Sequence, residues 1–378
     1  ELAPMAGVTN ASFRRLCREM AEAALPEAQT RALAVRMAAS CGRRLDDACP
    51  VVDATLPDGT RLNAVLPPLS ADGTLICLRT KRRSAFTLGQ LVEAGTVAPG
   101  LDSVLAALIE TRASCLITGA TGTGKTTLLA ALLGLVSATE RIVCIEEAAE
   151  LRPDHPHVLH LQERGDNVQG AGAVPMSALV RTALRMRPDR IVLGECRGPE
   201  VRDVLTALNT GHEGGWATLH ANSPADVPAR LTALGALAGL DETAVAAQAV
   251  SALDAVIHLR RSGATGGGIA GRRSPREGTA ERSSTRGSDG PDSCASPEQD
   301  VMSSRSSRTR RYVSGIGMLR RGAQGSLVCE DALIVALDGA AGTVCAVSAG
   351  PAVDRLAERI GAAPVAAAMK GGTSWTPL

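Results

Sequence analysis

The stretch GATGTGKT, residues 119–126, constrains the fold more than any other part of the sequence. It fits the pattern G-x-x-x-x-G-K-[ST], in which glycines let backbone N–H groups turn inward around phosphate oxygens at the N-terminus of a helix. An apolar, strand-like run (CLITG) enters the loop, and a helical run (TTLLAALLGLV) leaves it. These flanks disfavour a chance glycine-rich turn. We therefore predict a phosphate-binding P-loop within a strand–loop–helix unit.

The loop residues have separate expected roles. The Lys125 ammonium would neutralise the β- and γ-phosphates of a bound nucleotide, and the Thr126 hydroxyl would coordinate Mg²⁺. ATP and Mg²⁺ are therefore the expected cofactors. The predicted nucleotide-binding residues are Gly119, Thr121, Gly122, Thr123, Gly124, Lys125, Thr126 and Thr127.

Short apolar segments alternate with helical segments over residues 113–261. The apolar segments read CLITG, RIVCIEE, RIVLGE, WATLH and AVIHLR. Such alternation is typical of a mostly parallel sheet covered by helices. We therefore expect an α/β fold with its P-loop core in this range.

The flanking segments differ from this core in composition. Residues 21–85 predict a small α+β N-terminal domain, since a helical stretch precedes a hairpin signal in which Pro-Asp-Gly separates VVDATL from RLNAVLPPL. Residues 86–112 are expected to form a helical linker. The Ser-, Arg- and Gly-rich residues 262–311 cannot bury enough apolar surface to offset the entropy of ordering them, so we predict a disordered insertion. Residues 312–378 are the expected C-terminal extension.

Composition narrows the class of protein. A net charge of +1 argues against a general polyanion binder, and aromatic residues at 1% argue against stacking on bases. None of the ten cysteines forms a C-x-x-C pair, which favours a reducing compartment and no zinc site. No apolar run reaches the roughly 20 residues of a membrane-spanning helix. We therefore expect a cytoplasmic protein.

Acidic residues stand at the ends of two predicted strands. Carboxyl ends of parallel strands are where open α/β sheets bind ligands. Glu195, in RIVLGECRG, is therefore expected to orient the attacking water or to hold Mg²⁺ through a water; a surface acid at a strand end is the alternative. Of Glu146 and Glu147, in RIVCIEEAAEL, only one is expected to face the nucleotide, because neighbours on an extended segment point to opposite sides. Acids suited to a helix N-terminus are the other interpretation.

Two histidines lie in TGHEGGWATLHANSP. The zinc-protease pattern H-E-x-x-H fails here, because Trp216 stands at the second histidine position and two glycines disfavour a helix. His220 instead ends a predicted strand at the same edge as the P-loop, where it would bond the γ-phosphate or the attacking water; a histidine merely satisfied at a strand end is the alternative. His212 follows a helix C-terminus, and structural and functional roles stay equally open for it.

Taken together, the blocks GATGTGKTT, RIVCIEEAAEL, MRPDRIVLGECRG and TGHEGGWATLHANSP resemble the Walker A, Asp box, Walker B and His box of type II/IV secretion ATPases, most closely the CpaF-like motors of the Tad (Flp pilus) branch. The resemblance covers about residues 30–261 and resumes weakly at 312–361. It implies a RecA-like core and a homohexameric ring. The ring would be peripheral to the inner face of the cytoplasmic membrane, on an inner-membrane platform protein.

The same resemblance implies that ATP binds between the two domains. Arginines of the N-terminal domain and linker approach the nucleotide in this family, and the matching pieces LPDGTRLN and LICLRT assign that role to Arg61 and Arg79. Two departures bear on the site. The family's Asp box usually reads Glu-Asp, whereas this chain has Glu146-Glu147, and Trp216 replaces a small residue.

Residues 1–20 look foreign to this family. They resemble the opening of tRNA-dihydrouridine synthases, yet the Asn-x-Gly-Cys-Pro segment of those flavin enzymes is absent from the sequence. We interpret the segment as a fused or mis-joined fragment, with chance similarity as the alternative. The leading hypothesis is an Mg²⁺-dependent ATPase that powers pilus assembly or secretion. A ring subunit that binds ATP without hydrolysis, a nucleic-acid-translocating motor and a flavin enzyme are the rivals.

Overall fold

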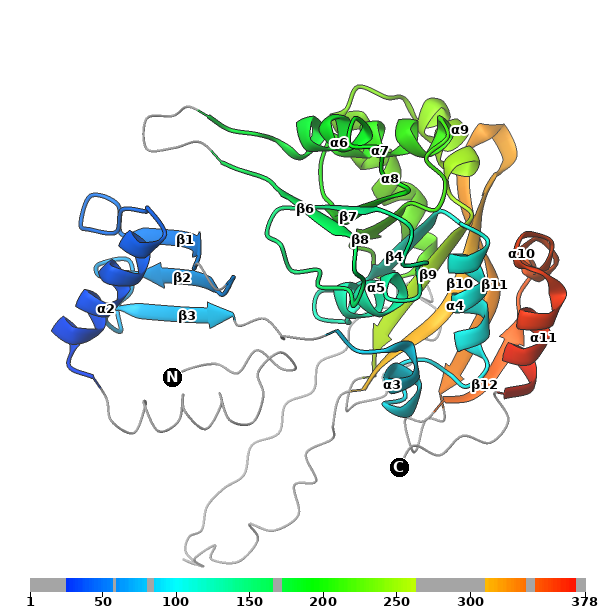
Figure 1. The fold of residues 1–378 in the computed structure, drawn as a ribbon, viewed down its shortest axis with the longest axis horizontal. Helices are drawn as coiled ribbons and strands as arrows, with labels where there is room; N and C mark the ends of the chain where they lie inside the picture. Colours follow the sequence, from blue (N-terminus) through cyan, green and yellow to red (C-terminus); the bar gives the residue numbers. More distant parts are fainter. Residues whose placement is uncertain are drawn as a thin grey trace, which may run out of the picture.

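A small N-terminal body lies beside a larger one in the computed structural model (Figure 1). The structure describes residues 25–56, 59–79, 85–165, 172–262, 310–337 and 344–371. The segment resembling a flavin enzyme and the interior of the predicted insertion lie outside these residues. Among the described residues, no helix combines the length and apolarity needed to cross a bilayer.

The N-terminal body is one helix on a three-stranded antiparallel sheet. Its elements are α2 (Glu27–Ser40), β1 (Val51–Thr55), β2 (Arg61–Val65) and β3 (Leu75–Arg79). The predicted hairpin forms with Val51 opposite Val65 and Thr55 opposite Arg61. Alternate strand residues such as Val52, Leu62 and Ala64 bury one face of the sheet against Ala34 and Ala38 of α2. The pairing leaves Arg61 and Arg79 opposite each other at one end of the sheet.

The larger body is built on a nine-stranded sheet with the order β12-β11-β10-β9-β4-β8-β7-β5-β6. The six strands from β9 to β6 are mutually parallel, which confirms the predicted α/β core. They are β4 (Cys115–Gly119), β5 (Ile142–Glu146), β6 (Val158–Gln162), β7 (Arg190–Cys196), β8 (Trp216–Leu219) and β9 (Ala255–Arg261). Sequence patterns missed β6, which extends the parallel edge beyond β5.

Helices cover both faces of this sheet, as the all-buried strands require. Along β4, Cys115 and Ile117 join one apolar cluster, and Leu116 joins the other. The first cluster holds α3 (Leu88–Glu93), α4 (Leu101–Glu110), α5 (Lys125–Leu133), α10 (Val353–Ile360) and α11 (Ala362–Gly371). The second holds α6 (Met176–Leu184), α7 (Glu200–Asn209), α8 (Val227–Leu237) and α9 (Glu242–Ala252).

Two predicted segments turn out to belong to this body. The expected helical linker supplies α3 and α4, whose Leu91, Leu101 and Leu105 are buried in the first cluster. The expected C-terminal extension adds the antiparallel strands β10 (Arg311–Arg321), β11 (Leu327–Leu337) and β12 (Val344–Ala349) to the same sheet. Antiparallel pairing carries β10 through Arg320 and Arg321, which lie opposite Val328 and Leu327 of β11.

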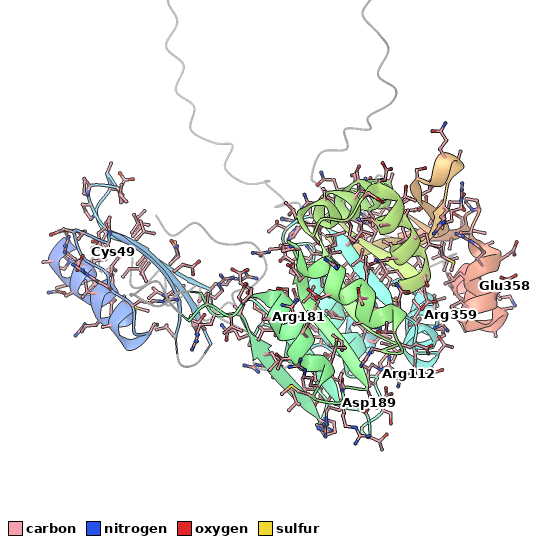
Figure 2. All side chains as sticks on the ribbon, turned by 90° about the horizontal axis from the view of Figure 1, so that it is seen from above. Cys49, Arg112, Arg181, Asp189, Glu358 and Arg359 are labelled. Carbon is pink, nitrogen blue, oxygen red and sulfur yellow. The ribbon has the colours of Figure 1, made fainter. Side chains whose placement is uncertain are left out.

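A buried ion pair fixes the start of β7. The Arg190 side chain is 2% exposed and donates from Nε to Glu140 at 2.9 Å and from Nη2 to the Ile109 carbonyl at 3.0 Å. Arg112 also donates to Glu140, as a second guanidinium partner, and to the Asp189 carbonyl. Figure 2 shows Arg112 and Asp189 together at the rim of the larger body. One carboxylate therefore compensates two arginines.

Removing that carboxylate should destabilise the larger body. Glu140→Ala leaves the Arg190 charge buried without a counterion, and the free energy of unfolding should fall by about 3 kcal/mol. Chemical denaturation followed by circular dichroism measures this loss. Asp47→Ala is the matched control, since its ion pair with Arg31 lies at the surface with Asp47 84% exposed. Equal effects of the two substitutions would contradict the buried-pair argument.

Candidate functional site

The phosphate-binding loop forms where β4 gives way to α5. Gly119, Gly122 and Gly124 have φ angles of 148°, 73° and 98°, which favour glycine. A Cβ on Gly119 would lie 2.5 Å from the Leu259 carbonyl oxygen, so the loop passes against β9 with no room for a side chain. The buried Thr123 hydroxyl donates to the Ala120 carbonyl at 2.9 Å and closes the turn. These glycine conformations are of the kind that let backbone N–H groups turn toward a phosphate.

Lys125 lies under this loop at the N-terminus of α5. Its Nζ donates to the Gly119 and Ala120 carbonyls at 3.0 and 3.2 Å and to His220 Nδ1 at 3.3 Å. The residue is 7% exposed, and burial lowers the pKa of its ammonium to about 8 against the opposing charge of Glu195. A polyanion bound in the loop would relieve this desolvated cation.

Glu195 and His220 meet at the ends of neighbouring strands. The β7–β8 register shifts between Leu193 and Cys196, and this bulge aims Glu195 at the segment after β8. His220 Nε2 lies 3.0 Å from Glu195 Oε1. Because Nδ1 accepts from Lys125, the proton is on Nε2 and donates to the carboxylate. The structure thus brings together the P-loop lysine, Glu195 and His220, three residues expected at one edge of the sheet.

Electrostatics keep this pair in opposite states. Burial would raise the pKa of the Glu195 carboxyl, but a hydrogen bond from Arg197 and the charges of Arg197 and Lys125 outweigh it and hold the pKa below its usual range. Burial and the Lys125 charge lower the pKa of His220 despite Glu195. At neutral pH Glu195 is therefore an ionised acceptor and His220 a neutral donor.

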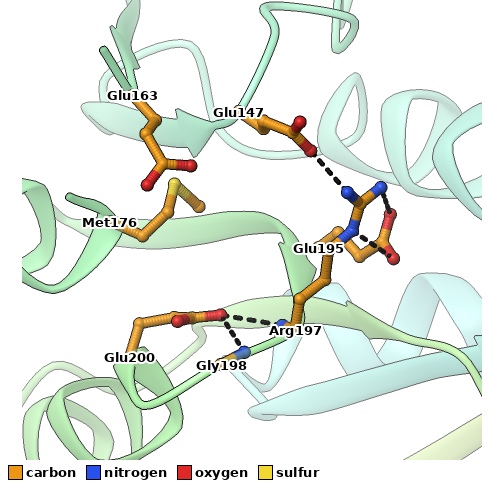
Figure 3. A pocket seen from close by; sticks show the side chains of 7 residues that line it. All are labelled: Glu147, Glu163, Met176, Glu195, Arg197, Gly198 and Glu200. Atoms are coloured by element: carbon orange, nitrogen blue, oxygen red, sulfur yellow. Dashed lines mark hydrogen bonds and ion pairs between the residues drawn. The ribbon is translucent and has the colours of Figure 1, made fainter. Parts of the chain in front are cut away.

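Arg197 links Glu195 to the segment that follows β5. We call this segment, residues 147–151, the acid loop. Arg197 Nε and Nη2 donate to the two Glu195 oxygens at 2.8 and 2.9 Å, and its Nη1 donates to Glu147 Oε2 at 2.6 Å (Figure 3). These groups line a cavity of about 200 Å³. The lining residues are Glu147, Glu163, Met176, Glu195, Arg197, Gly198 and Glu200.

Only one of the two Asp-box acids faces this cavity. Glu147 lies at it, half exposed, whereas Glu146 is 3% exposed and points into the protein. Glu146 Oε1 accepts from the backbone N–H groups of Glu150 and Leu151, each at 2.9 Å. The structure therefore gives Glu146 the role of holding the acid loop in place, and Glu147 the role of presenting a charge.

The two predicted N-terminal arginines reach the acid loop. Arg79 Nη2 lies 3.0 Å from Glu150 Oε2. Arg61 lies 3.7 Å from Glu147, 3.9 Å from Glu150 and 3.7 Å from Asp53 of its own sheet. Both arginines therefore stand at the contact between the two bodies, paired with carboxylates.

The remaining predicted residues divide in two groups. Thr121, Gly122, Thr126 and Thr127 all belong to the loop or to the first turn of α5, as expected. His212 does not join them: it follows α7 and precedes β8, so it lies at the opposite sheet edge from His220, with its N–H bonded to the Ala207 carbonyl at 3.3 Å. The described chain holds no cluster of three metal-ligating side chains.

Sequence reasoning missed Arg197 and Glu150. A signal for Arg197 existed, since residues two apart on an extended segment point to the same side, as Glu195 and Arg197 do. No such signal existed for Glu150, whose position depends on the turn that Glu146 holds.

Comparison with known proteins identifies the relatives of this chain. The family profile described as type II/IV secretion system protein matches residues 16–303. A Mycobacterium tuberculosis protein named "Putative conjugal transfer protein" is 52% identical over 241 residues, which cover 62% of this chain and 68% of that protein. The Bordetella pertussis "Type IV secretion system protein PtlH" is 37% identical over 227 residues, covering 53% and 66% of the two chains. Among solved structures, the VirB11 ATPase of the Brucella suis type IV secretion system is 25% identical with a TM-score of 0.36, covering 60% of this chain and 74% of that one.

The pKa of Lys125 predicts that nucleotide binding depends on pH. With a pKa of about 8, the free lysine loses its proton above that pH, whereas a bound triphosphate favours the charged ammonium. Binding should therefore take up a proton there, and the Kd of a non-hydrolysable ATP analogue should rise by up to about tenfold per pH unit. Titration calorimetry from about pH 7 to about pH 9, in two buffers of different ionisation enthalpy, measures both quantities.

Lys125→Arg is the control for this titration. Its guanidinium stays charged over the whole range, so its Kd should not rise with pH. The same pH dependence in both proteins would assign the titration to another group.

Proposed function

The chain belongs to the type II/IV secretion system protein family, and from this membership and the site geometry we propose that it hydrolyses ATP to drive a secretion or pilus machine. The observation that carries the proposal is the contact of Lys125, His220 and Glu195 at the mouth of a glycine-rich loop. A phosphate-binding cation and an ionised water acceptor thus lie within one chain of hydrogen bonds. ATP binding without hydrolysis would not require the ionised water acceptor.

The roles in hydrolysis follow from the charges. The loop amides and Lys125 hold the β- and γ-phosphates. The ionised Glu195 accepts a hydrogen bond from the attacking water and orients it toward the γ-phosphorus. The neutral His220 fixes one carboxylate oxygen and stands between Glu195 and the lysine, so that it donates to the carboxylate without neutralising it.

Mg²⁺ fits this site through the Thr126 hydroxyl. That hydroxyl lies in the first turn of α5, and it makes no hydrogen bond to the described part of the chain. Mg²⁺ commonly takes one or two protein ligands, with phosphates and waters completing its shell, so a large cluster of carboxylates is not required. When bound, the ion supplies charge neutralisation on the phosphate oxygens.

The N-terminal body contributes Arg61 and Arg79 to the proposed reaction. Nucleotide phosphates would compete with Glu147 and Glu150 for these guanidinium groups, and arginine stabilises the charge that develops on a transferring phosphoryl group. Closure of one body on the other then accompanies the reaction. A homohexamer of the Tad type, docked on an inner-membrane platform protein at the cytoplasmic face, is the assembly that we propose for this motor.

A turnover assay tests this function. Mg²⁺-dependent ATP hydrolysis per subunit should rise with protein concentration, because ring assembly completes each site. Glu195→Gln keeps the shape of the side chain but removes its charge, so turnover should fall by at least about a hundredfold while ATP binding persists. Phosphate release and analogue binding are the two measurements.

Glu213→Gln is the matched control, because this exposed acid lies before β8, at the sheet edge opposite His220. It should hydrolyse ATP at the parent rate. A parent protein that binds ATP without turnover would overturn the proposal in favour of a non-hydrolysing ring subunit. Turnover that requires DNA or RNA would favour a nucleic-acid motor instead.

A further inference from the structure

A continuous line of polar contacts runs from the phosphate loop to the N-terminal body. Lys125 contacts His220, and His220 contacts Glu195. Arg197 then links Glu195 to Glu147, whose other oxygen lies 3.7 Å from Arg61. Arg197 hydrogen-bonds two carboxylates from two separate segments, the end of β7 and the acid loop.

We propose that Arg197 is a positioning residue. It holds the Glu195 carboxylate in the orientation that directs the attacking water only while the acid loop is in place, and it so couples hydrolysis to the N-terminal body. This inference rests on the proposed ATPase function. It assigns to Arg197 no contact with the nucleotide.

The acceptor capacity of Glu195 limits where a water can be held. A carboxylate offers about four lone-pair directions. His220 Nε2 and Arg197 Nε use those of Oε1, and Arg197 Nη2 uses one on Oε2. Among the described contacts, one direction on Oε2 is left for a water. Arg197 therefore decides where on Glu195 the water is held.

The shape of the guanidinium suits this bridge between two carboxylates. Its planar fork gives two parallel bonds to Glu195 and a third, from Nη1, to Glu147. A lysine ammonium has no such fork and cannot reproduce this geometry. The backbone beneath Arg197 is fixed as well, since Glu200 Oε1 accepts from the N–H groups of Arg197 and Gly198 at 2.7 and 2.8 Å.

The other end of the bridge lies at the acid loop. Glu147 is shared between Arg197 and Arg61, and Glu150 is shared between Arg61 and Arg79. If the N-terminal arginines leave these acids, Arg197 is the partner that Glu147 keeps among the described contacts. A movement of the N-terminal body away from these acids thus changes the charge balance around Arg197. Through Arg197, it also changes the electrostatic environment of Glu195.

A stability role does not explain this arrangement. The Arg197 side chain is 57% exposed, and ion pairs at such exposure contribute little to folding. Replacing Arg197 should therefore leave the melting temperature nearly unchanged and alter the reaction, which separates positioning from structure.

The test measures Mg²⁺-ATP turnover by the full chain with Arg197→Gln, Arg197→Lys and the control Arg202→Gln. Arg202 is exposed on α7 and outside the cavity lining. We expect Arg197→Gln to lower kcat by at least about tenfold with KM within about twofold, as for an interaction realised in the transition state. Arg202→Gln should match the parent.

The pH profile gives a readout that a structural role would not move. The titratable and charged groups facing Glu195 are Arg197, the neutral His220 and Lys125. Loss of Arg197 removes a hydrogen bond that lowers the Glu195 pKa, so the acid limb of kcat against pH should move to higher pH in Arg197→Gln. Arg197→Lys should keep the limb closer to that of the parent without restoring kcat.

Coupling to the N-terminal body is tested by a double-mutant cycle with Arg61→Gln. If Arg197 relays that contact, the double variant should lose much less kcat than the product of the two single losses. Fully multiplicative losses, or an Arg197→Gln kcat at or above that of Arg202→Gln, would overturn the proposal. If Arg197→Gln fails to fold by circular dichroism, the Arg197→Lys values decide by the same criteria. An inactive parent would overturn the proposed function itself.

Discussion

The parallel pairing of β9, β4, β8, β7 and β5 is the constraint on which the rest of the structure depends. Parallel strands place all their carboxyl ends at one edge, so the P-loop after β4, Glu195 at the end of β7, His220 after β8 and the acid loop after β5 become neighbours. None of these segments is adjacent in sequence. The apolar strand cores, buried on both faces, hold this edge rigid beneath the polar groups that stand on it.

Charge compensation then organises the groups at that edge. Three cations there have acidic or lone-pair partners: Lys125 has His220, Arg197 has Glu195 and Glu147, and Arg79 has Glu150. A polyanionic nucleotide would compete for several of these cations at once. Binding at the P-loop and the fit of the N-terminal body are therefore two aspects of one electrostatic balance, which agrees with a motor that turns phosphate chemistry into movement between domains.

The sequence was most informative where a local pattern determines geometry. The P-loop glycines, the five apolar strands and the Pro-Asp-Gly hairpin follow from backbone preference and periodicity, and each was predicted. β6 escaped prediction because its partly buried residues lack a clear apolar run. The sequence alone could not show which of Glu146 and Glu147 faces the cavity. Neighbouring residues on an extended segment point to opposite sides, but this alternation does not say which side chain points inward. The partners of Arg61 depend on how two bodies meet, and no short-range pattern encodes that.

Backbone hydrogen–deuterium exchange, with and without a non-hydrolysable ATP analogue, tests most directly whether the phosphate loop and the N-terminal body form one site. We expect the analogue to change exchange in three separate places: the P-loop at 119–126, the acid loop at 147–151 and the strands that carry Arg61 and Arg79. Changes confined to the P-loop would contradict the account, because they would show that phosphate binding is not felt across the contact between the two bodies.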